Sequence, residues 1–68
     1  MLVNVRFEKT LNEAIAAGGE TEGALVLVDK DGACCVVARG LDQHVEQYCA
    51  RHDGVEAMTM EEARARGL

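Results

Sequence analysis

Cysteine and histidine are the residues of this 68-residue chain whose side chains could act as nucleophile, base or metal ligand. Cys49 and His52 are three positions apart, so on a helix the imidazole could hold the thiol as a thiolate. Cys49 falls in an apolar stripe, however, where a free cysteine behaves as a small hydrophobic side chain. The chain contains no serine, which excludes a Ser-His-Asp triad. We therefore predict no catalytic residue.

A zinc site is the second chemistry that these residue types could support. Cys49 and His52 could be joined by His44 and by either Cys34 or Cys35. Structural zinc sites usually have two close-spaced pairs of ligands on turns. Only one such pair occurs here, in the middle of an expected helix. No metal and no other cofactor is predicted.

The charge of the chain bears on its partners. It has 12 acidic and 7 basic side chains, and a net charge of -5 with histidine neutral. Recognition of phosphate backbones requires clustered Lys and Arg, whereas the basic residues here are scattered. A nucleic-acid partner is therefore not expected, and the acidic surface favours basic protein partners or simple solubility.

The cysteine count bears on the compartment. Three cysteines, of which Cys34 and Cys35 are adjacent, do not form a disulfide framework, so we expect free thiols in a reducing, cytoplasmic environment. No apolar run approaches the roughly 20 residues of a membrane span. The first nine residues have no long apolar stretch behind a basic start, so no signal peptide is expected.

The first third of the chain predicts a strand followed by a helix. Residues 2–8 alternate apolar and polar side chains with period two, which is typical of a half-buried strand. Thr10 and Glu13 have the spacing of a capping box that begins a helix. Gly18 and Gly19 would end that helix, because glycine accepts left-handed dihedrals.

The middle of the chain predicts a β-hairpin. Residues 24–29 and 33–38 are rich in Val, Leu and Cys, and residues 29–32, Asp-Lys-Asp-Gly, read as a type I turn with Gly32 in the left-handed position. The pairing that follows places Val28 opposite Cys34.

The last third predicts a helix, a short strand and a second helix. Residues 41–52 carry apolar side chains at helical spacing, and residues 55–58 read as a strand. Thr59 and Glu62 form a second capping box, which opens a C-terminal helix that ends near Gly67.

The order β-α-β-β-α-β-α predicts a single small α+β domain over residues 1–68. The first six elements match the ferredoxin-like plan, a two-layer arrangement in which helices cover one face of an antiparallel sheet. Another small α+β arrangement with the hairpin packed differently is the alternative. The expected core side chains are Val3, Val5, Phe7, Leu25, Leu27, Val45 and Tyr48.

A two-layer fold requires strands that alternate apolar and polar side chains, and the two strands of the hairpin do not. Both of its faces are apolar: one carries Leu25, Leu27, Cys35 and Val37, and the other carries Val26, Val28, Cys34 and Val36. A two-layer fold buries only one of them, so something must cover the second. A second copy, a different protein and the C-terminal helix are the three alternatives. We expect the second face to be an interface in a homodimer or with a protein partner, through Val26, Val28, Cys34 and Val36.

These patterns predict a small, acidic, non-enzymatic protein-interaction module, such as an inhibitor or adaptor of a larger complex. Phage-encoded inhibitors of bacterial defence systems, anti-CRISPR proteins among them, are often this small, but that analogy is one of size and charge alone. The alternatives are a regulatory domain that binds a small ligand as a dimer, and an enzyme or metal protein using Cys49, His52 and a hairpin cysteine.

Overall fold

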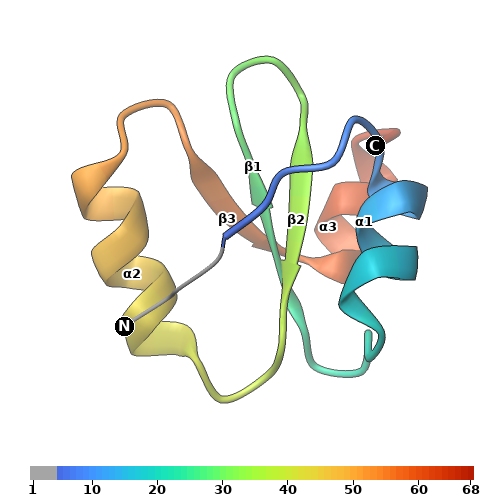
Figure 1. Cartoon of the computed structure of the whole chain (residues 1–68), viewed down its shortest axis with the longest axis horizontal. Coiled ribbons are helices and arrows are strands. Elements are labelled where there is room, and N and C mark those ends of the chain that lie inside the picture. The colour runs from blue at the N-terminus through green and yellow to red at the C-terminus, as the bar shows by residue number, and fades with distance from the viewer. Residues whose placement is uncertain (1–4) are drawn as a thin grey trace.

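The computed structural model describes residues 5–68, which form a three-stranded antiparallel sheet and three helices (Figure 1). The strand order is β2-β1-β3, so the first hairpin strand lies in the centre. This confirms the α+β class with an antiparallel sheet. None of the helices in this part of the chain has the length and apolar character to cross a membrane. The elements are α1 (Leu11–Gly18), β1 (Leu25–Val28), β2 (Cys34–Val37), α2 (Asp42–Arg51), β3 (Glu56–Thr59) and α3 (Met60–Ala65).

The hairpin has the predicted register, with Val28 opposite Cys34. Its turn is fixed by the Asp29 carboxylate, which accepts hydrogen bonds from the backbone N–H groups of Asp31 and Ala33, both at 2.9 Å. Such bonds are the reason aspartate favours turns. Gly32 has a φ of 85°, the left-handed conformation that the turn was expected to need.

Threonine side chains begin two of the helices. At α1, the Thr10 hydroxyl accepts from the backbone N–H of Glu13 at 3.1 Å. At α3, the Thr59 hydroxyl accepts from the N–H of Glu62, and the Glu62 carboxylate accepts from the N–H of Thr59, so the predicted capping box is complete. Gly19, with a φ of 82°, ends α1 as expected.

The structure corrects the predicted first strand, residues 2–8, over residues 5–8, which are the ones it describes. Residues 2–4, and with them the expected core residue Val3, lie outside the described residues. Residues 5–7 are not a strand, and only Glu8 pairs with β2, exchanging two hydrogen bonds with Cys34 at 2.7 and 2.8 Å. The chain instead crosses to the α2 side (Figure 1), where Val5 and Phe7 pack against half of the core. Burial of these two side chains takes the place of further pairing along β2.

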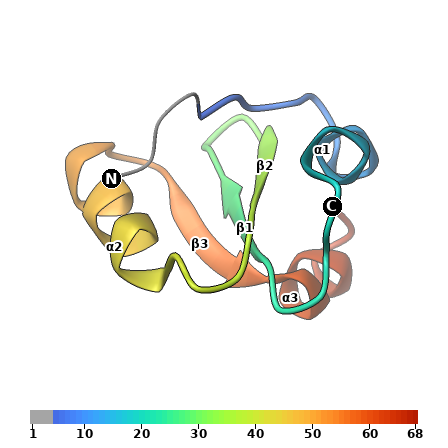
Figure 2. The ribbon, with the colours of Figure 1, turned by 60° about the horizontal axis from the view of Figure 1, so that its bottom comes forward.

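The helices cover both faces of the sheet, which corrects the expected two-layer plan with helices on one face. Helices α1 and α3 lie on one side and α2 on the other (Figure 2). The physical reason is the hairpin itself, because both of its faces are apolar and each must be buried. The ferredoxin-like plan therefore does not describe the arrangement of residues 5–68.

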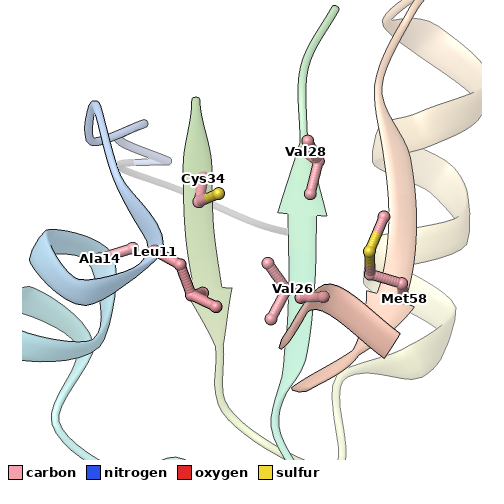
Figure 3. Close-up of a cluster of buried hydrophobic side chains, with 7 residues drawn as sticks. Leu11, Ala14, Val26, Val28, Cys34 and Met58 are labelled. Carbon is pink, nitrogen blue, oxygen red and sulfur yellow. The ribbon is translucent and has the colours of Figure 1, made fainter. Parts of the chain in front are cut away.

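Each side of the sheet has its own core cluster. We call them the α1/α3-side cluster and the α2-side cluster. Figure 3 shows the first, in which side chains of all three strands meet those of α1. Its buried members are Leu11, Ala14, Val26, Val28, Cys34, Met58 and Ala63. Those of the α2-side cluster are Leu27, Val37 and Val45.

A lysine at Val26 should prevent folding. Val26 is 0% exposed, and an unpaired charge buried there would cost several kcal/mol, a large part of the roughly 5–15 kcal/mol that holds a domain together. Ala57→Lys, at an exposed position on β3, is the matched control and should fold. Far-ultraviolet circular dichroism with urea titration checks both. A cooperatively folded Val26→Lys protein would show that this face is open.

Loss of the cap at α3 should be measurable. Thr59→Ala removes the acceptor for the N–H of Glu62, and loss of such a cap costs about 1 kcal/mol. Thr21→Ala changes a loop threonine whose contribution to the turn is its carbonyl, which accepts from the N–H of Ala24. It should shift the free energy of unfolding by less than about 0.5 kcal/mol. Equal effects of the two variants in urea unfolding would contradict the capping assignment.

Candidate interaction surface

The structure buries three of the four residues of the predicted interface and leaves the fourth, Val36, half-buried. Val26, Val28 and Cys34 are 0%, 7% and 0% exposed, under α1 and α3, and Val36 is half-buried against the same cluster. This corrects the expectation that the second hairpin face needs another chain to cover it. The cover comes from Leu11 and other residues of α1 together with α3, so Val26, Val28 and Cys34 are not available to a partner in the folded chain.

The three thiols lie in separate surroundings and are free. Cys34 belongs to the α1/α3-side cluster, Cys35 points to the opposite face, and Cys49 lies on α2. Burial raises the pKa of all three. For Cys35 the backbone N–H of Arg6 lowers the pKa in part, and the Glu8 carboxylate raises it further. A raised pKa disfavours the thiolate, which is the reactive form.

His52 stacks on an aromatic ring. Its imidazole lies over the Tyr48 ring, with the ring centroids 4.0 Å apart and the planes inclined by 22°. Tyr48 in turn lies 6.4 Å from the Phe7 ring. Within residues 5–68 no three or more His, Cys, Asp or Glu side chains are grouped so that they could hold a metal ion. The geometry thus gives the imidazole a packing role beside Tyr48.

The thiols should alkylate slowly in the folded chain. At a pH below 9.0, the ordinary pKa of the group, iodoacetamide should modify all three more slowly than in urea-unfolded chain, and Cys34 the most slowly, because it is 0% exposed. Peptide mass spectrometry measures each site. Cys34 reacting as fast in the folded as in the unfolded chain would contradict its placement.

The same shifts predict a loss of stability in alkali. The thiols have a higher pKa in the folded than in the unfolded chain, so their contribution is present below pH 9.0 and is lost as the pH rises through the raised value. The urea midpoint should therefore fall above pH 9.0, and Cys34→Ala should reduce the size of this fall. An unchanged pH dependence in that variant would contradict the assignment for Cys34.

The α2-side cluster is incompletely covered. Among residues 5–68, it has three buried side chains and eight half-buried ones, whereas the α1/α3-side cluster has seven buried and four half-buried. The half-buried set, which we call the α2-side rim, contains the chain's single Phe and single Tyr. Its members are Val5, Phe7, Leu25, Cys35, Leu41, Tyr48, Cys49 and Val55. This is where the described part of the chain offers grouped apolar surface to a partner.

A groove of about 310 Å³ lies beside the rim, between α1 and the N-terminal segment. We call it the edge groove, because its floor is the outer edge of β2. Arg6 and Glu8, whose side chains are 3.5 Å apart, form one wall. Its lining residues are Arg6, Glu8, Ala14, Ala17, Gly18, Cys35 and Val36.

Sequence analysis predicted neither the α2-side rim nor the edge groove as an interaction surface. Of the site residues that it did predict, the structure gathers Val26, Val28 and Cys34 into the core and leaves only Val36 on the edge groove. The period-two pattern of residues 2–8 was the one available signal, since it marks Phe7 as apolar on a segment near the hairpin.

Comparisons of the chain with protein-family models, with curated proteins and with solved structures give no match.

Proposed function

We propose that this chain is a non-enzymatic protein-interaction module that acts by binding a protein partner, as an inhibitor or adaptor of a larger complex. The observation that carries the proposal is the α2-side rim, where eight apolar side chains are only half-buried. Surface of this kind on a small acidic protein is typical of an interaction site.

The composition of the rim supports protein binding. Phe7, Tyr48 and His52 form a continuous run of rings, since Tyr48 contacts both of the others. Aromatic side chains dominate the binding energy of many interfaces, because they bury a large area and lose little rotamer freedom. Asp42 and Glu46 are exposed on α2 beside the rim, which suits a partner with basic residues around an apolar centre.

The state of the thiols supports binding over catalysis. Their pKa values are raised by burial, while an enzyme nucleophile usually has a lowered pKa or an adjacent base. His52, the nearest candidate base in sequence to Cys49, is stacked on Tyr48. Three free cysteines also support a reducing, cytoplasmic location.

A photo-crosslinker placed in the rim tests the proposal. p-Benzoylphenylalanine replaces Tyr48 in one protein and Arg64, an exposed residue of α3, in the control, and both are irradiated in cells of the native host. We expect a discrete crosslinked product from position 48 and none from position 64. A product of twice the chain mass identifies a homodimer, and any other mass identifies a different protein. No product from position 48, or equal products from both positions, would refute the proposal.

Once the partner is identified, substitutions on α2 give a quantitative test. Tyr48→Ala should weaken binding by roughly tenfold or more, a loss of about 1.4 kcal/mol or more, as is typical of an aromatic side chain that contributes strongly to an interface. Gln47→Ala, an exposed neighbour on the same helix, should leave the affinity nearly unchanged. Titration calorimetry measures both, and urea unfolding verifies that each variant is folded.

A further inference from the structure

Within residues 5–68, the outer edge of β2 has a backbone partner at Cys34 and none at Val36. Antiparallel ladders alternate, so successive residues direct their N–H and C=O groups to opposite sides of the strand. Cys34 directs both groups away from β1, to Glu8, at 2.8 and 2.7 Å. Ala33, one position earlier, directs its carbonyl to the N–H of Asp29 at 3.0 Å. Val36 has the same parity as Cys34, and its N–H and C=O therefore also point away from β1, into the edge groove.

The described part of the N-terminal segment, residues 5–8, does not pair with Val36. In the register of Glu8 with Cys34, the residue opposite Val36 would be Arg6. The backbone N–H of Arg6 instead interacts with the Cys35 thiol, and the segment turns toward the α2-side rim. Within residues 5–68, the N–H of Val36 thus has no hydrogen-bond partner and its carbonyl accepts only from the Cys35 thiol, at 4.0 Å. Backbone groups in a half-buried position are costly unless they are well hydrogen-bonded.

Small residues keep the groove open beside these groups. Ala14, Ala17 and Gly18 form the α1 wall, and none carries a long side chain. A Cβ on Gly18 would lie 3.6 Å from the Val36 carbonyl oxygen and 3.1 Å from the Val36 Cβ, closer than side chains normally approach, so the absence of a side chain at Gly18 lets this end of α1 lie against Val36. A strand residue paired with Val36 would direct its side chain to this wall, because paired residues share a face.

We infer that the edge groove is a docking site for an extended segment of a partner protein, which adds a short strand beside β2 and pairs with Val36. This inference rests on the proposed function and names its mode of binding. An extended backbone offers a donor and an acceptor at the spacing that Val36 requires, as in other cases of strand addition. The site is short, because Glu8 already pairs with Cys34 and β2 ends at Val37. A compact apolar side chain fits between Val36 and Ala17.

The position of the edge favours a partner's segment over a second copy. Val36 lies between α1 on one side and the Arg6–Glu8 wall on the other. Two β2 edges cannot meet about a two-fold axis without contact between these flanking walls, whereas a single strand can enter. The groove therefore suits an isolated extended segment.

A model strand tests the site directly. The probe is the acetylated peptide amide Val-Thr-Val-Thr-Val, added to isotope-labelled protein, and the control is the same peptide N-methylated at its central valine, which removes one donor. We expect the probe to shift the amide signal of Val36 saturably and to slow its hydrogen exchange, and the control peptide to have neither effect. Ala17→Leu, which fills the groove, should abolish the shift, and Ala16→Leu, an exposed position on the same helix outside the groove, should preserve it.

Three results would overturn the inference. The first is the absence of any shift at Val36 at millimolar probe. The second is a Val36 amide already protected in the free protein, to the same degree at all concentrations, which would show that residues before Glu8 occupy the edge. The third is protection that rises with protein concentration, which would assign the edge to a second copy. Crosslinking at position 48 is a separate readout. If a partner is captured there but the probe peptide leaves the Val36 amide signal unchanged, this inference is refuted and the proposed function is not.

Discussion

The arrangement of the whole molecule depends on one constraint, which is that both faces of the β1–β2 hairpin are apolar and both must be removed from water. Val26 and Leu27 are neighbours on β1, they face opposite ways, and each is 0% exposed. The 68 residues form only short helices within the described part of the chain, and these are divided between the two faces of the sheet. The result is a central sheet between α2 on one side and α1 with α3 on the other (Figure 2).

The two covers are unequal, and this inequality generates the surface to which we assign function. On the α1/α3 side, two helices bring small side chains such as Ala14 and Ala63 close to the sheet, and seven residues become buried. On the other side α2 acts with only the N-terminal segment, and most of the apolar side chains there remain half-buried. A domain this small leaves a large share of its surface exposed, and here that share includes both phenylalanine and tyrosine rings.

Local structure could be predicted from the sequence, but the helices that cover each face of the sheet could not. The hairpin register and the box formed by Thr59 and Glu62 depend on contacts within a few residues, and both are as expected. Sequence analysis left the C-terminal helix as one of three alternative covers, because the sequence does not reveal how closely a helix with Ala63 at its centre approaches the sheet. Ala63 is 0% exposed. Val26, Val28 and Cys34 of the predicted interface are buried for the same reason, because small side chains such as Ala14 and Ala63 let α1 and α3 lie close to the sheet.

The α2-side rim and the edge groove have a common origin in the path of the chain before Glu8. Had residues 5–7 continued along β2, Arg6 would lie opposite Val36 and the groove would be filled by backbone. The segment instead turns away after its single bridge, and this turn carries Phe7 to within 6.4 Å of the Tyr48 ring. One departure from the sheet therefore adds an aromatic ring to the rim and, among the described residues, leaves the N–H and C=O of Val36 without a backbone partner at the strand edge. The two surfaces meet at Cys35, which belongs to the rim and lines the groove. A partner that inserts a strand beside Val36 would consequently lie next to the rim, where the rest of its surface can complete the burial of the half-buried rings of Phe7 and Tyr48.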